Sequence, residues 1–183
     1  MKNLMIILFL TCIAFAQDNQ TEIMCVSIDD FDDTEMLLGG RTIMYEDGGD
    51  LKSQGMSWMG SLAKKKGKIS LSSLILTVIG LESSCVDKDS TLDIILENGE
   101  KIKLTNWKDF NCKGTNYFNL SAKDVSKISQ SKMKAVRYTE KKSYETMTVK
   151  DEMSEESSAY LQNLIVEINE VNAGNLSIAE CAG

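Results

Sequence analysis

The sequence predicts an α+β fold: an antiparallel sheet with a short helix between strands and a long C-terminal amphipathic helix packed on it. Three observations favour this class. Strand-like segments occupy most of residues 41–149, one short helical segment interrupts them after residue 121, and a helical period follows residue 154. The connections are short and regular βαβ alternation is missing, which argues against a doubly wound parallel sheet.

The first predicted strands are residues 41–45 and 51–58. The segment 46–50 between them (Glu-Asp-Gly-Gly-Asp) is typical of a turn, because glycine tolerates a positive φ. Residues 69–81 alternate at first and then become continuously apolar, which is the pattern of a strand entering the buried centre of a sheet. The basic run 64–68 before this strand is interpreted as a solvated turn.

Residues 91–107 give the clearest local prediction, a hairpin that turns at Asn98-Gly99. A two-residue loop pairs residues whose numbers sum to 197, which places Leu96 opposite Lys101. One more loop residue raises the sum to 198, so that Leu96 meets Ile102. Burial of apolar pairs should outweigh ideal turn length, so a three-residue loop or a bulge is expected.

After the strand 117–120, Ser121 is expected to cap a short helix that ends near Gln130, with Asp124 three positions after the cap. A second hairpin follows, with strands 133–139 and 143–149. Ser154 then caps the long helix and Gly174 ends it. The apolar stripe of this helix is interpreted as core-facing rather than as a groove for a partner; it comprises Leu161, Leu164, Ile165, Ile168 and Val171.

Composition excludes several classes of function. The chain has 183 residues, with 27 Asp+Glu against 20 Lys+Arg, a formal net charge of −7 and no histidine. Without histidine, Ser-His-Asp and Cys-His catalysis, the usual catalytic zinc sites and a histidine pH switch are excluded. An acidic chain is poorly suited to nucleic acid or anionic membranes, so no nucleic acid partner is predicted.

The first residues have the three parts of a secretory signal peptide, residues 1–16. Lys2 supplies the positive charge, residues 4–13 the apolar core, and cleavage is expected between Ala16 and Gln17. The apolar core is short of the roughly 20 residues that cross a bilayer, so the mature chain is predicted to be soluble, without a membrane span, and periplasmic or secreted. Lipoprotein processing at Cys12 is disfavoured by the threonine before it.

The mature chain, 17–183, is expected to form a single α+β domain. Its first part, 17–40, is acidic and poorly periodic and is expected to be irregular, and residues 175–183 form a tail. No internal repeat and no Pro- or Gly-rich linker divides the chain.

Removal of Cys12 leaves four of the five cysteines, and none forms a C-x-x-C pair. In an exported chain this favours disulfides over metal ligation. Cys85 and Cys112 flank the Asn-Gly hairpin and their numbers sum to 197, so they lie across from each other in the ladder. Regular pairing would place them at a hydrogen-bonded site, where side chains stand farther apart, unless a bulge shifts the ladder. Cys25 and Cys181 near the two mature ends are a second possible pair without local support.

No metal site, cofactor or catalytic residue is predicted. Two acidic clusters match no calcium-binding loop and are interpreted as solvated: Asp29, Asp30, Asp32, Asp33 and Glu35, and Asp87, Asp89 and Asp93. Five aromatic residues could stack against sugars, but aromatic side chains in strands are more often core or cross-strand contacts: Trp58, Trp107, Tyr117, Tyr138 and Tyr144.

Three phrases, ENGEKIKLTNW (97–107), FNCKG (110–114) and YFNLSAKDVSKI (117–128), resemble a loose group of small uncharacterised exported proteins of Bacteroidetes-type bacteria. The resemblance covers roughly residues 68–150. It implies export, this order of elements and a recurring cysteine on each side of the hairpin, here Cys85 and Cys112. It implies no activity and supplies no catalytic residue.

The sequence therefore predicts an exported, non-catalytic binding or structural module of the cell envelope or extracellular space, which contacts a protein or a glycan. The alternative from another class is a histidine-independent hydrolase of envelope polysaccharide, which would use a pair of carboxylates. A purely structural envelope component is a third alternative.

Overall fold

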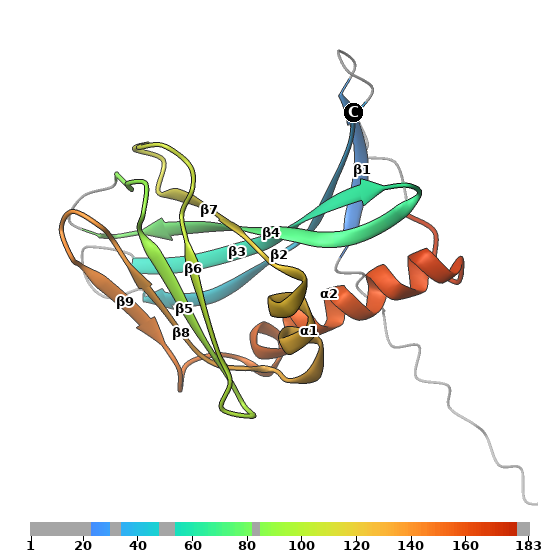
Figure 1. The fold of residues 1–183 in the computed structure, drawn as a ribbon. Helices are drawn as coiled ribbons and strands as arrows, with labels where there is room; N and C mark the ends of the chain where they lie inside the picture. Colours follow the sequence, from blue (N-terminus) through green and yellow to red (C-terminus); the bar gives the residue numbers. More distant parts are fainter. Residues whose placement is uncertain (1–22, 30–33, 48–53, 82–84, 179–183) are drawn as a thin grey trace, which may run out of the picture.

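The computed structural model describes residues 23–29, 34–47, 54–81 and 85–178. These residues form two antiparallel sheets and two helices, so the α+β class predicted from the sequence is confirmed. The sequence did not indicate that the strands divide into two sheets, whose strands cross steeply in Figure 1.

The larger sheet has five strands in the order β1-β2-β3-β4-β7. They are β1 (Ile23–Asp29), β2 (Thr34–Asp47), β3 (Gln54–Lys65), β4 (Lys68–Ile79) and β7 (Thr115–Asn119). The region 17–40, which showed no clear period, supplies β1 and the first half of β2. Between β3 and β4 the chain turns at Lys66-Gly67, both with positive φ, and the basic run 64–68 is exposed as expected.

The smaller sheet has four strands in the order β6-β5-β8-β9. They are β5 (Thr91–Leu96), β6 (Lys101–Thr105), β8 (Met133–Thr139) and β9 (Thr146–Val149). The two sheets join where β6 leads into β7: Asn106 pairs with Phe118, and the Trp107 N–H donates to the Tyr117 carbonyl at 3.1 Å.

The hairpin between β5 and β6 corrects the predicted register. Its loop has three residues, as expected, but the pairs sum to 196, with Leu92 opposite Leu104 and Ile94 opposite Ile102. The loop is therefore 97–99 rather than 98–100. A three-residue hairpin loop needs a left-handed residue at its third position, and only in this register does Gly99, with φ 85°, occupy it.

Both helices begin and end where the sequence predicts. For α1 (Ala122–Gln130), the Asp124 N–H donates to the Ser121 hydroxyl and the Asp124 carboxylate accepts from the Ser121 N–H, which completes a capping box. For α2 (Glu155–Ala173), the Ser157 N–H donates to the Ser154 hydroxyl at 3.1 Å, and Gly174 ends the helix with φ 79°. Neither of these two described helices has the length and apolar character needed to span a bilayer.

The core lies between the two sheets and α2. The predicted stripe of α2 is buried at Leu161, Leu164, Ile165 and Ile168 and partly buried at Val171, so it faces the core. Leu164 packs onto Gly60 of β3, where a Cβ atom would lie 2.3 Å from its methyl carbon. The Tyr160 hydroxyl accepts from the Gly60 N–H at 2.9 Å and donates to the Gly40 carbonyl, which fastens the helix to the sheet.

Candidate functional site

The side of the five-stranded sheet turned away from α2, here called the outer face, carries large apolar side chains interspersed with hydroxyl groups and Arg41. Cross-strand partners lie on the same side of a sheet, and one row across β2, β3, β4 and β7 reads Arg41, Met59, Ile75 and Tyr117. The next row reads Ile43, Ser57, Thr77 and Thr115. Ile43 is 59% exposed and Ile79 is 54% exposed, so large aliphatic side chains meet solvent on this face.

The corresponding side of the four-stranded sheet is charged. Asp93 lies opposite Lys103 on β6 and Arg137 on β8, and the Arg137 guanidinium donates to its carboxylate at 3.0 Å. Lys101 and Thr148 are also exposed there. An antiparallel sheet with one solvated face normally has this polar pattern, so the outer face of the larger sheet is the exception.

A hollow of about 120 Å³ opens on the outer face over β2, β3 and β4. Apolar, hydroxyl and amide side chains line it, together with one cation and one carboxylate: Arg41, Ile43, Tyr45, Glu46, Gln54, Met56, Ser57, Thr77 and Ile79, with the backbone of Gly55. Gly55 allows β2 and β3 to approach, since a Cβ atom there would lie 3.1 Å from the Tyr45 carbonyl oxygen.

Ser57 fixes the orientation of the Arg41 guanidinium. The Nε and Nη2 groups of Arg41 both donate to the Ser57 hydroxyl, at 2.9 and 2.6 Å, and Ser57 is buried. An arginine has five N–H donors, so the two on Nη1 and one on Nη2 are left over. Among the residues that the structure describes, no carboxylate forms an ion pair with Arg41, although Glu46 lines the same hollow.

An aromatic pair lies at the other end of the first row. The rings of Trp107 and Tyr117 have centroids 5.8 Å apart and planes tilted by 57°. The Lys108 ammonium lies 5.6 Å from the Trp107 ring and 5.8 Å from the Tyr117 ring, in cation–π geometry. Trp107 is 47% exposed, so this pair extends the outer face to the β6–β7 loop.

A disulfide between Cys85 and Cys112 lies beside that loop, as predicted from the hairpin arithmetic, with the Cα atoms 3.8 Å apart. Val86 and Asn111 next to it exchange two backbone hydrogen bonds, at 2.8 and 3.1 Å. Pair numbers sum to 196 in the hairpin and to 197 here, because regular pairing is interrupted and 106–110 holds one residue more than 87–90. This shift puts the cysteines at a non-hydrogen-bonded site, where side chains are closer.

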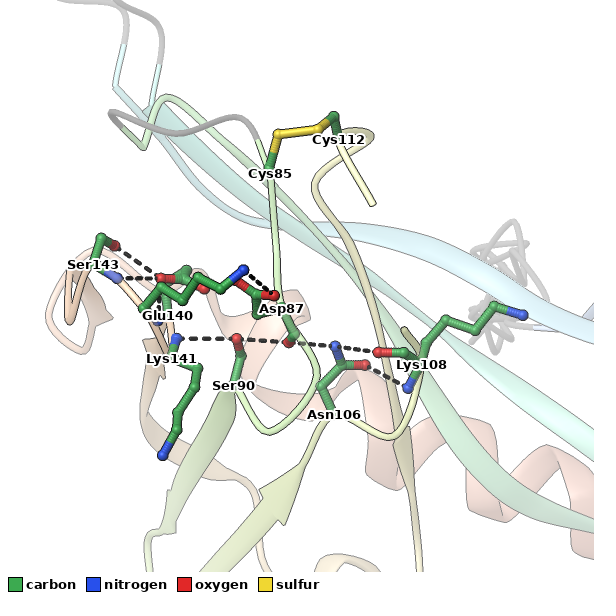
Figure 2. Close-up of polar contacts among 10 residues, drawn as sticks. Cys85, Asp87, Ser90, Asn106, Lys108, Cys112, Glu140, Lys141 and Ser143 are labelled. Atoms are coloured by element: carbon green, nitrogen blue, oxygen red, sulfur yellow. Dashed lines mark hydrogen bonds and ion pairs between the residues drawn. A yellow bond between two sulfur atoms is a disulfide. The ribbon is translucent and has the colours of Figure 1, made fainter. Parts of the chain in front are cut away.

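The disulfide ties together two of the three places where the chain passes between the sheets, the third being the passage from β7 through α1 to β8. Cys85 lies in the passage from β4 to β5, and Cys112 lies in the passage from β6 to β7. Figure 2 shows the bond above a polar network in which Asn106 donates to the carbonyls of Asp87 at 2.9 Å and Lys108 at 3.2 Å. The β6–β7 loop therefore presents Trp107 from a braced backbone.

Glu140 is buried but has a structural role. One carboxylate oxygen accepts from the backbone N–H groups of Lys142 and Ser143, at 2.7 and 2.6 Å, and from the Ser143 hydroxyl at 3.0 Å (Figure 2). These bonds close the turn between β8 and β9. Burial raises the pKa of nearby Tyr138, whose hydroxyl donates to the Asn116 side chain at 3.2 Å.

The structure separates the five aromatic residues considered from the sequence. Trp58 and Tyr138 are core residues, 1% and 0% exposed, whereas Trp107 and Tyr117 come together on the outer face. Tyr144 is 74% exposed in the β8–β9 turn.

The acidic residues whose side chains the structure describes do not gather into a site. Asp87 pairs with Lys142 at 2.9 Å and Asp93 with Arg137. Within the described ranges, no three acidic or cysteine side chains are arranged to hold a metal ion.

Several predictions lie outside the described residues. They are the signal peptide with its cleavage site at Ala16 and Gln17, the acidic cluster around Asp29–Asp33, most of the 175–183 tail, and a Cys25–Cys181 bond, since the structure describes neither the Cys25 side chain nor Cys181.

The sequence predicts neither the hollow nor the position of Arg41, although it carries a signal for apolar side chains on the outer face. The continuous apolar run in 69–81 predicts a strand in the buried centre of a sheet. In the structure Leu74, Leu76 and Val78 face the core, whereas Ile75 is only partly buried and Ile79 is exposed on the outer face. The apolar residues of the run that alternate with the core positions, Ile75 and Ile79, therefore lie on the outer face of the sheet. Comparison of the chain with models of known protein families, with curated proteins and with solved structures found no match.

Proposed function

We propose that this protein is an exported, non-catalytic binding module of the cell envelope or extracellular space, and that it contacts its partner through the outer face. The observation that carries the proposal is the contrast between the two sheets: one exposes charged pairs, the other exposes Ile43, Ile79 and Trp107. Contiguous exposed apolar side chains rimmed by polar groups are typical of interaction sites.

Two features support export. The first 16 residues have the pattern of a signal peptide, and the Cys85–Cys112 bond is of a kind that persists in oxidising compartments. The resemblance to small exported proteins of Bacteroidetes-type bacteria agrees with this compartment.

The hydrolase alternative has less support. Acid–base cleavage of a glycosidic bond requires two carboxylates facing each other across a cleft. Of the described residues that line the hollow, Glu46 alone is acidic. This lining supports a non-catalytic binding function better than hydrolysis.

The test is to weaken the outer face without disturbing the fold. Ile43→Thr/Ile79→Thr removes apolar surface and keeps strand-compatible side chains. Val166→Thr is the matched control, because Val166 is 55% exposed but lies on α2. The mature chain is incubated with envelope fractions of the producing bacterium, and bound protein is measured after sedimentation. We expect binding to fall several-fold for the double variant only; equal retention of all three proteins would refute the proposal.

A further inference from the structure

We propose that the hollow on the outer face is a carboxylate-binding site that takes a uronic acid residue of an acidic glycan. This inference rests on the proposed function and names the ligand class for the same surface. Arg41 is the anion receptor, and the hydroxyl and amide side chains around it contact the sugar.

The Arg41 guanidinium has one edge in use and one edge left for a ligand. Its Nε/Nη2 edge is occupied by the Ser57 hydroxyl. The Nη1/Nη2 edge keeps one N–H on each nitrogen, which is the fork that matches the two oxygens of a carboxylate. Because buried Ser57 already fixes the guanidinium, little rotational freedom remains to be lost on binding.

The hollow lies away from the edges of the sheet. It lies over β2, β3 and β4, where β3 is paired along both sides, rather than at an edge of the sheet. A peptide that adds as a strand needs an unpaired edge, and capture of a peptide C-terminus uses free backbone N–H groups. On this face the backbone groups of β3 are paired on both sides, and the pairing is interrupted only at an irregularity in β2 between Ile43 and Tyr45, so recognition falls mainly to side chains.

The lining of the hollow combines polar and apolar side chains. Ser57 and Thr77 carry hydroxyls, Gln54 carries an amide and Tyr45 an aromatic ring, next to the aliphatic Ile43 and Ile79. A sugar ring presents hydroxyls at its rim and C–H groups on its faces, so this mixture suits it. The hollow of about 120 Å³ has room for one small acidic group and part of a ring, with the rest of the ligand lying outside it.

The net charge of the chain and the local charge of the hollow have opposite signs at Arg41. The chain carries a formal −7, so it has no general attraction for polyanions and any acidic ligand must be held locally. Arg41 supplies that local charge, while Glu46 in the same lining opposes it. Further along the outer face, the partly buried Tyr117 and the exposed Trp107 offer a ring pair to a sugar farther along the glycan.

The test uses the mature chain with its disulfide intact and three probes: trigalacturonic acid, a neutral galactose trisaccharide and a short peptide with a free C-terminus. Amide chemical shifts are followed by NMR during titration. We expect trigalacturonic acid to shift the amides of Gly55, Ser57 and Thr77, with no saturable response to the neutral sugar. Tighter binding of the peptide, or equal binding of the acidic and neutral sugars, would overturn the proposal.

Variants locate the site. Arg41→Gln should weaken trigalacturonic acid binding about tenfold or more, because it removes a charged hydrogen-bonding partner. Glu46→Gln should strengthen binding, and Arg137→Gln on the other sheet should leave it unchanged. Thermal unfolding checks that each variant is folded. If Arg41→Gln has no effect while Ile43→Thr/Ile79→Thr still loses envelope binding, the ligand assignment is wrong and the proposed function stands.

Discussion

The two sheets of this protein each bury one face in the core, and they differ in the side chains on the opposite face. Each turns one face inward: Leu92, Ile94 and Tyr138 from the smaller sheet, Trp58 and Leu76 from the larger, all buried. Outside, the smaller sheet follows the solvent pattern, with strict alternation along β6 and β9. The larger sheet breaks that pattern along β4.

This difference teaches how to interpret a continuous apolar strand. Stability needs one apolar face per sheet, because burial against the core supplies the hydrophobic free energy. A second apolar face has a reason only if something covers it, either another layer of the fold or a partner. In β4 no described layer covers Ile79, so its side chain adds little to the core, and under the proposed function it contacts the partner.

The largest expected effect comes from cutting the link between the sheets. Cys85→Ser/Cys112→Ser opens a bond with sequence separation 27, which should cost roughly 3–4 kcal/mol of unfolding free energy in the chain-entropy model. Denaturant unfolding measures the loss. Hydrogen exchange should rise in both passages, 85–90 and 106–114. A loss confined to one sheet would mean that the disulfide does not couple them.

Reducing agent provides the control for this variant. It should destabilise the parent protein strongly and the double variant much less, since the variant has already lost the bond. An equal response of both proteins would assign the stability to another thiol pair.

A smaller effect is expected at the attachment of α2 to the larger sheet. Tyr160→Phe removes the acceptor for the buried Gly60 N–H and the donor to the Gly40 carbonyl. An unsatisfied buried group should cost about 1–3 kcal/mol. Exchange of the Gly60 amide should accelerate while the β5–β8 amides keep their protection at matched stability. Uniform acceleration in both sheets would show that they unfold as one unit.

The smaller sheet can be probed by pH through Tyr138. Burial raises its pKa, so the folded state keeps a proton that the unfolded chain loses above about pH 10. The contribution of Tyr138 to stability is fully present below that pH and is lost as the pH rises through the folded-state pKa. Tyr138→Phe should cost about 1 kcal/mol at neutral pH through its lost hydrogen bond and should flatten the alkaline decline.

Tyr144 is the matched control for the pH experiment, because its side chain is 74% exposed. Tyr144→Phe should leave the decline of unfolding free energy between pH 9 and 11 as steep as in the parent. A flattened profile for Tyr144→Phe would contradict the assignment to the buried residue.

The smallest expected effect sharpens the comparison most. Ile43→Thr and Ile79→Thr on the outer face should each change the unfolding free energy by less than about 0.5 kcal/mol, since neither side chain is buried. Thermal unfolding measures this. A loss of about 2 kcal/mol would mean that these residues serve the fold, and the functional interpretation of the outer face would fail.

Local features were predictable from the sequence because their causes are local. The caps at Ser121 and Ser154, the end at Gly174 and the three-residue loop before β6 each depend on a few neighbouring residues. The Cys85–Cys112 bond followed from counting outward from that loop. The predicted register was wrong by two in the pair sum, because the prediction considered only the burial of apolar pairs. The loop also needs a left-handed residue at its third position, and Gly99 supplies it.

The division into two sheets and the hollow could not be predicted. The first depends on β7 pairing with β4 across some forty residues of chain, and on Asn106, whose carbonyl side-chain oxygen accepts from the Tyr117 N–H at 2.9 Å to form the junction. The second depends on Arg41 and Ser57 meeting diagonally on neighbouring strands, with Gly55 allowing close approach. Such contacts between distant residues leave no periodic trace in one sequence.

The fastening of α2 by Tyr160 sets an order of events during synthesis. This side chain closes contacts with residues 100 and 120 positions earlier. The strands of the smaller sheet are all present once residue 149 has emerged, but the larger sheet, begun first, lacks the helix that covers its inner face until the last part of the chain follows. Contacts of such sequence separation form late. A chain whose last segment has not yet emerged therefore holds its first four strands without their cover, and docking of α2 completes the core.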